Sequence, residues 1–117
     1  MNSLLKNYDN AFLFVHGKDN ECTILRMQAF CIANNINILE LAQTKSDDKK
    51  VINKTFVELV KDIKERGVRS FLIVKSGDSL CLGFKEMEQL QDLIERGAIV
   101  VWCLDEHALL VNPEKAK

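Results

Sequence analysis

The chain has 117 residues, of which 47% are hydrophobic and 28% are charged, and its 16 basic and 17 acidic residues leave a net charge of −1. This length suits one domain with a core of its own. Direct binding of DNA or RNA is disfavoured, because it generally requires a concentrated basic face and the two charge signs here are interleaved. No apolar run reaches the length of a membrane span, and MNSLLKNYDN lacks the apolar core of a signal peptide, so we expect a cytoplasmic protein without a membrane segment.

Four long strands are predicted, and residues 107–111 are a candidate for a short fifth strand at an edge. The third and fourth strands contain the apolar runs FLIV and AIVVWCL, which are typical of strands covered on both faces. The long strands are expected at residues 11–15, 36–41, 69–74 and 98–104.

Three helices are predicted between these strands, at residues 22–34, 50–66 and 82–96. Gly67 and Gly97 follow the charged last turns of the second and third helices, where a glycine typically adopts the left-handed conformation that ends a helix. Both helices repeat apolar residues at helical spacing along one face, which is expected to be buried. These positions are Ile52, Phe56, Leu59, Val60 and Ile63 in the second helix, and Phe84, Met87, Leu90 and Ile94 in the third.

The alternation of strand and helix predicts an α/β fold, a three-layer α/β/α sandwich around a mainly parallel sheet of four or five strands. Helices on both faces follow from right-handed crossovers. Residues 1–117 are expected to form this single domain, with flexible ends at residues 1–9 and 112–117.

The four cysteines predict no cofactor or metal site. They form no C-x-x-C pair and no zinc-binding spacing, so reduced and mostly buried thiols are expected. The first strand is not followed by a glycine-rich phosphate loop, which argues against a nucleotide cofactor. The cysteines are Cys22, Cys31, Cys81 and Cys103.

Polar residues gather where the strands are predicted to end. In open α/β sheets, ligands bind in the crevice at the carboxyl ends of the strands. Here that edge collects charged and polar side chains of both signs. They come from residues 16–19, 44–48, 75–81 and 105–107.

The third of these loops contains the string GDSL, at residues 77–80, which resembles the first block of the GDSL esterases. In that family the serine, here Ser79, is the nucleophile and needs a base and an oxyanion hole. The family also carries Asp-x-x-His near its end. Asp105 and His107 are one residue too close to match it, so the esterase is a less favoured hypothesis.

A longer ordered set of motifs resembles the catalytic domain of the resolvase/invertase serine recombinases. That family has a Tyr-x-Arg-x-Ser strand, a polar loop and a helix, an acidic loop before the second helix, an Asp-Arg-Leu-x-Arg loop, and a fourth strand running to Leu-x-Glu. This chain supplies FLFVHGKDNE, RMQAFCIANNINILEL, KSDDKKVINKTFVELVKDI, RSFLIV, GDSLCL, LQDLIERG and VVWCLDE in the same order. The resemblance covers almost the whole chain and implies the same α/β architecture.

The departures from the family imply that catalysis has been lost. His16 takes the place of the nucleophilic serine, and the family's arginines are replaced at four positions, so no catalytic residue is predicted. Without guanidinium groups, the charge that develops on a DNA phosphate during strand exchange is not offset. The arginine positions are taken by Phe14, Asn53, Ser79 and Leu82, and with His16, Lys18, Asp47 and Asp78 they make up a vestigial active-site rim.

These observations favour a non-catalytic domain that binds a protein partner through the rim, as a regulator or as an accessory factor of a mobile element. One alternative is a module that binds a small molecule or a phosphate in the same crevice. A second is a phosphorylation switch similar to the anti-sigma-factor antagonists, with Ser79 as the modified residue. An active recombinase is less favoured. Self-association stays open: Leu4, Leu5, Leu109 and Leu110 are a candidate dimer patch, but single exposed leucines are also normal on a protein surface.

Overall fold

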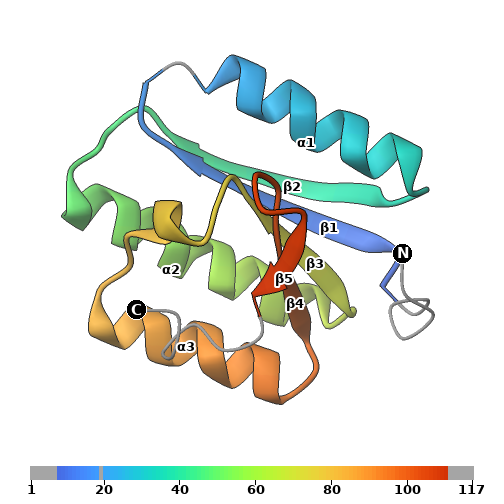
Figure 1. Cartoon of the computed structure of the whole chain (residues 1–117). Coiled ribbons are helices and arrows are strands. Elements are labelled where there is room, and N and C mark those ends of the chain that lie inside the picture. The colour runs from blue at the N-terminus through green and yellow to red at the C-terminus, as the bar shows by residue number, and fades with distance from the viewer. Residues whose placement is uncertain (1–7, 19, 111–117) are drawn as a thin grey trace.

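The computed structural model of the chain describes residues 8–18 and 20–110 (Figure 1). Within these residues strands and helices alternate as far as the fourth strand, and a short 3-10 helix precedes the last α-helix. The elements are β1 (Asn10–His16), α1 (Glu21–Ala33), β2 (Asn37–Thr44), α2 (Lys49–Arg66), β3 (Ser70–Val74), η2 (Asp78–Leu80), α3 (Phe84–Glu95), β4 (Ile99–Cys103) and β5 (Ala108–Leu110).

The strands form one sheet in the order β2-β1-β3-β4-β5. The first four strands are parallel to their neighbours, and β5 pairs with β4 in the antiparallel direction. Helices α2 and α3 cover one face and α1 covers the other (Figure 1). The predicted three-layer α/β/α sandwich with a mainly parallel sheet is therefore confirmed, including the short edge strand.

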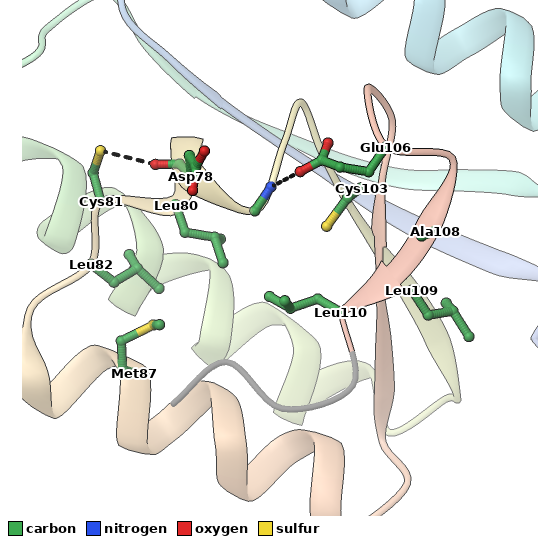
Figure 2. Close-up of a pocket in the computed structure, with 11 residues that line it drawn as sticks. Asp78, Leu80, Cys81, Leu82, Met87, Cys103, Glu106, Ala108, Leu109 and Leu110 are labelled. Atoms are coloured by element: carbon green, nitrogen blue, oxygen red, sulfur yellow. Dashed lines mark hydrogen bonds between the residues drawn. The ribbon is translucent and has the colours of Figure 1, made fainter. Parts of the chain in front are cut away.

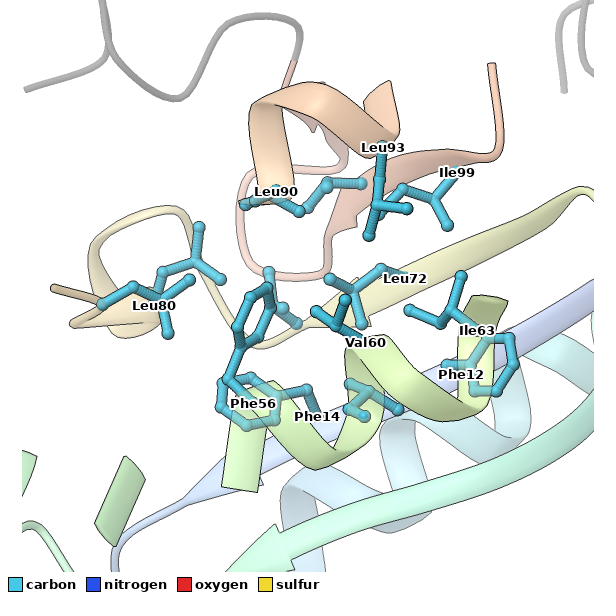
Figure 3. Close-up of a cluster of buried hydrophobic side chains, with 14 of the residues drawn as sticks. Phe12, Phe14, Phe56, Val60, Ile63, Leu72, Leu80, Leu90, Leu93 and Ile99 are labelled. Carbon is cyan, nitrogen blue, oxygen red and sulfur yellow. The ribbon is translucent and has the colours of Figure 1, made fainter. Parts of the chain in front are cut away.

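Strands β1 and β3 are buried on both faces, as the run FLIV predicts for β3, whereas buried and partly buried residues alternate along β4, so the cover predicted for its two faces is complete on one face only. Along β1, Phe12 and Phe14 face α2 and α3, whereas Leu13 and Val15 face α1. This alternation follows from the two-residue period of a strand. Figure 3 shows the larger of the two resulting clusters, in which the Phe14 and Phe56 rings meet edge to face with centroids 5.7 Å apart.

The ends of α2 and α3 agree with the sequence. The Asp48 side chain caps α2 by accepting a hydrogen bond from the Lys50 amide at 2.9 Å. Gly67 ends α2 with φ +61°, and Gly97 follows Arg96 at the end of α3 with φ +73°. Both glycines adopt the predicted left-handed conformation.

The predicted inner face of α3 is partly wrong. Phe84 is 71% exposed, and Leu93 is buried where no buried residue was expected. The helix begins at Phe84 and not at Leu82, because residues 78–80 form η2 and Gly83 precedes the first turn. Phe84 therefore stands in that first turn on the solvent side.

The cysteines and the chain ends also differ from the expectation. Cys31 and Cys103 are buried but Cys22 and Cys81 are exposed, and all four are free thiols, so burial applies to only half of them. Tyr8, which falls in the end predicted to be flexible, donates a hydrogen bond from its hydroxyl to the Gly97 carbonyl at 3.1 Å. Leu4, Leu5, residues 1–7 and residues 111–117 lie outside the described residues. None of the described helices is both long enough and apolar enough to cross a membrane.

Candidate functional site

The loop after β1 is tied to the end of β2. The Gly17 amide donates to the Thr44 carbonyl at 3.0 Å, and the Asn20 side-chain amide donates to the same carbonyl at 3.3 Å. These bonds hold the start of α1 against the carboxyl ends of both strands. The crevice predicted from the sheet topology is therefore bounded on this side by Gly17 and Asn20, which are both hydrogen-bonded to the end of β2.

His16 and Asp47 come together at this edge, as the predicted rim requires. The His16 Nδ1 lies 3.5 Å from Asp47 Oδ1, and the exposed fractions of the two side chains are 13% and 71%. A Cβ added to Gly17 would stand 2.8 Å from the same carboxylate oxygen. Gly17 has φ +97°, so this position needs a glycine both for its backbone conformation and for the approach of Asp47.

A small cleft lies beside His16, between the carboxyl ends of β1 and β3. Its volume is about 30 Å3, which leaves room for about one or two water molecules. Its polar lining comes from His16, Asn20, Thr23 and Lys75. This is the point where the connections leave the sheet toward opposite faces, which is where such folds bind ligands. The cleft is too small to enclose a nucleotide or a sugar phosphate.

The arginines lie away from this cleft. Arg26 on α1 pairs with Asp105 at 2.8 Å, and Arg66 reaches the Leu39 carbonyl and the Glu40 carboxylate on β2. Of the remaining two, Arg69 directly precedes β3 and Arg96 ends α3 three residues before β4, so both stand at the amino-terminal edge of the sheet. Since all the arginines of the sequence fall within the described residues, none of them lines the cleft beside His16.

The other predicted rim residues are divided among separate places. Asp78 begins η2 and is exposed, and Lys18 lines a different cavity of about 540 Å3 together with Lys45. Asn53 accepts a hydrogen bond from the Gly83 amide at 2.9 Å, which joins α2 to the start of α3. Ser79 belongs to η2, but its side chain lies outside what the structure describes.

Two residues of the predicted rim are core residues. Phe14 is 2% exposed and Leu82 is 7% exposed, and both belong to the cluster beneath α2 and α3. The reason for Phe14 is the strand period, because it points to the opposite face from Leu13 and Val15. Phe14 contributes only to the wall of the cleft beside His16, and Leu82 only to the wall of a cavity between η2 and α3, so the exposed rim is smaller than the sequence predicts.

Two contacts at the same edge were not predicted. Glu106 accepts a hydrogen bond from the Gly77 amide at 2.8 Å, which ties the loop after β3 to the loop after β4. Arg26 reaches Asp105 from the other side of the sheet. Neither contact has a signal in the sequence, because each joins segments that lie far apart along the chain.

Metal binding and nucleophilic attack by a buried thiol have little support among the described residues. Among the described residues, no three histidine, cysteine, aspartate or glutamate side chains are grouped so that they could hold a metal ion. Burial raises the pKa of the Cys31 thiol to about 11, and burial together with Glu106 raises the pKa of Cys103 to about 11. Both remain protonated near neutral pH and are poor nucleophiles.

Comparison with protein-family models and with curated proteins found no match for this chain. The resemblance to the resolvase family therefore rests on the order of motifs in the sequence and on nothing else.

Proposed function

We propose that this chain is a non-catalytic, resolvase-like domain that acts by binding another protein, with the outward face of α1 as its docking surface. The observation that carries the proposal is a row of four exposed apolar residues on that helix. They are Cys22, Leu25, Ala29 and Ile32, spaced three, four and three residues apart, and we call them the α1 stripe.

The α1 stripe is the side of the helix that faces away from the sheet. Met27 and Cys31 on the inner side are buried, whereas Leu25 is 64% exposed and Ile32 is 77% exposed. Spacings of three and four residues place side chains in one line along a helix, which is the pattern that a second helix packs against. Burial of each of the two large side chains would stabilise a complex by about 1.5–3 kcal/mol.

The charges near the α1 stripe favour an apolar partner. Arg26 lies on the same helix, but its guanidinium is engaged by Asp105 beyond β4. Glu21 in the first turn is the other charged residue of α1. A single exposed leucine is common on protein surfaces, but an uncharged row of this length is typical of an interaction site. The partner we infer presents the apolar face of an amphipathic helix.

The carboxyl-end edge supports the non-catalytic part of the proposal. Phosphoryl transfer to or from DNA requires positive groups aimed at the phosphate oxygens. The cleft beside His16 is lined by one lysine, Lys75, and the arginines lie elsewhere. A His16 side chain next to Asp47 lacks the surroundings that would stabilise a phosphorane-like transition state.

The test compares the wild-type chain with two charge variants in affinity capture from its native cell. In Leu25→Glu/Ile32→Glu, charges interrupt the α1 stripe, and in Phe84→Glu the same change is made at an exposed residue on the opposite layer. We expect one protein to be retained by the wild type and by Phe84→Glu and to be lost from the double variant. Identical proteins on all three, with the double variant folded by circular dichroism, would contradict the docking surface.

The non-catalytic part has its own measurement. The purified chain is incubated with a duplex oligonucleotide, and covalent adducts and nicks are analysed on a denaturing gel. We expect neither product. Either product, if lost in His16→Ala, would overturn this part of the proposal.

A further inference from the structure

A second recess lies on the other layer of the molecule, between η2, α3 and β5. Figure 2 shows the residues that line it, which come from the loop after β3, the start of α3 and the antiparallel edge strand. Its volume is about 420 Å3, within the range of about 300–1,000 Å3 typical of small-molecule sites. We propose that this recess, the η2 cavity, binds a small organic cation with an apolar body, such as an aryl-alkyl ammonium.

The interior of the η2 cavity is apolar. Leu80, Leu82 and Met87 line it on the side of η2 and α3, and Leu110 faces them from β5 (Figure 2). Cys103 adds a thiol, and its raised pKa of about 11 keeps it protonated and uncharged. Such a lining favours a hydrocarbon or aromatic group, because binding removes the apolar surfaces of both the ligand and the cavity from water.

The polar groups at the η2 cavity have one sign of charge. Asp78 and Glu106 line it, and none of the described lining residues is basic. Glu106 is held in place by the hydrogen bond that its Oε1 accepts from the Gly77 amide at 2.8 Å. Two carboxylates beside an apolar recess attract a cation and repel a carboxylate or phosphate. The ligand class follows from this combination of an apolar interior and acidic groups.

The backbone around the η2 cavity is held in a costly conformation. Cys81 has φ +48° and His107 has φ +50°, although neither is a glycine. Only one further described non-glycine residue, Asn35, shares this property. A left-handed non-glycine residue costs about 1 kcal/mol or more, and such residues concentrate at ligand-binding sites. Both loops that form the cavity therefore contain a left-handed non-glycine residue, Cys81 at the end of η2 and His107 in the turn before β5.

This site is distinct from the docking surface proposed above. Helix α1 and its α1 stripe belong to the layer on the opposite face of the sheet, whereas Leu80, Leu82, Met87 and Leu110 of the cavity interior belong to or pack against the cluster beneath α2 and α3. The cleft beside His16 is also separate, because it lies at β1 and β3 and shares no lining residue with the η2 cavity. The two proposals can therefore fail independently.

The experiment measures affinity by calorimetric titration with three probes of similar size. Phenethylamine is positive at neutral pH, phenylethanol is neutral, and phenylpropionate is negative. We expect the amine to bind about tenfold more tightly than the carboxylate, because charge-assisted hydrogen bonds and the sign of the field both favour it. Equal affinity for the amine and the carboxylate would overturn the proposal.

Two variants locate the binding. Gly77→Ala places a methyl group 3.6 Å from Glu106 Oε1, 3.9 Å from Leu110 Cδ1 and 4.0 Å from Cys103 Sγ, all ordinary contacts, so the fold is retained while the recess is narrowed. Gly77 has φ −58°, which alanine adopts without strain. We expect Gly77→Ala to weaken amine binding at least about tenfold, as one added methyl group does in a fitted pocket.

Glu106→Gln tests the charge, because it keeps a carbonyl acceptor for the Gly77 amide and removes the negative charge. The matched control is Glu88→Gln, an exposed residue of α3 that does not line the cavity and changes the net charge by the same amount. We expect Glu106→Gln to weaken amine binding about tenfold and to leave phenylethanol binding unchanged. Glu88→Gln is expected to change the binding of neither probe. Equal losses in the two variants would show that only bulk charge matters and would contradict the site.

Discussion

Arg26 on α1 and Asp105 after β4 form an ion pair, with Arg26 Nη2 2.8 Å from Asp105 Oδ1. The same helix meets β4 again where the rings of Phe30 and Trp102 stack with centroids 5.1 Å apart. A single helix on this face therefore spans the sheet from β2 to β4, and its outward face is left for other contacts.

The Arg26 and Asp105 pair is expected to add little stability. Their side chains are 48% and 38% exposed, and pairs of this kind contribute about 0–1 kcal/mol because water and salt screen them. We expect Arg26→Ala and Asp105→Ala each to lower the free energy of unfolding by less than about 1 kcal/mol in urea titrations. In a double-mutant cycle the coupling should shrink as salt is added. A coupling that is insensitive to salt would contradict this.

Truncation of two phenylalanines is expected to change the free energy of unfolding by very different amounts. Phe56 is fully buried against Phe14, and Phe84 is 71% exposed. Phe56→Ala should lower the free energy of unfolding by about 3–5 kcal/mol, because it removes apolar burial and leaves a cavity. Phe84→Ala should change it by less than about 0.5 kcal/mol. Chemical denaturation measures both, and similar effects of the two substitutions would refute the assigned face of α3.

Gly17→Ala is expected to destabilise the chain by about 1–2 kcal/mol. The φ of +97° disfavours alanine, and the added Cβ would crowd Asp47 Oδ1 at 2.8 Å. Asp47 is 71% exposed and can move aside, so most of the cost is expected in the backbone. In the double variant Gly17→Ala/Asp47→Ala, the removal of the Asp47 carboxylate should therefore restore only a minor part of the free energy of unfolding that Gly17→Ala loses. Full recovery would instead assign the cost to the contact.

The four thiols are expected to divide into two classes in labelling with an aromatic disulfide at neutral pH. Cys22 and Cys81 are exposed and should react quickly, whereas Cys31 and Cys103 are buried and should react only on unfolding. The variant Cys22→Ser/Cys81→Ser provides the control, because its fast phase should vanish. A fast phase that persists in it would contradict the burial of the other two.

The buried thiols also predict a loss of stability in alkali. Burial raises the pKa of Cys31 and Cys103 from 9.0 to about 11, with a further contribution from Glu106 at Cys103. Below pH 9.0 both thiols are protonated in the folded and the unfolded chain, so their ionisation does not lower the free energy of unfolding. As pH rises from 9.0 to about 11 the unfolded chain releases its thiol protons first, so the free energy of unfolding should fall.

Denaturation midpoints across this range measure the effect. Cys31→Ala/Cys103→Ala is less stable throughout, but it should show a flatter dependence on pH than the wild type. An equally steep decline in both chains would assign the alkaline loss to other groups.

The sheet was predictable because its signals are local. The runs FLIV and AIVVWCL identify β3 and β4 without knowledge of their neighbours, and the glycines after α2 and α3 identify the helix ends. The first turn of α3 was predicted wrongly, because the apolar period continues through Phe84 while Gly83 and η2 decide where the helix begins.

The candidate site was less predictable than the fold. The pairing of His16 with Asp47 follows from both residues ending up at one edge of a parallel sheet. The burial of Phe14 and Leu82 depends on which face of the sheet each side chain meets, and a motif alignment carries no such information. The η2 cavity exists because β5 folds back antiparallel to β4. The short apolar segment in the sequence predicts an edge strand but not the direction in which it runs.

The antiparallel return of β5 has a consequence for how this chain behaves in a crowded solution. At that border the described part of β5 is Ala108–Leu110, and at the opposite border the Arg66 guanidinium donates a hydrogen bond to the Leu39 carbonyl of β2 at 3.5 Å. Short or obstructed borders discourage the strand-by-strand growth that leads to fibrils. We therefore expect Arg66 to hinder the pairing of a further strand with this part of β2.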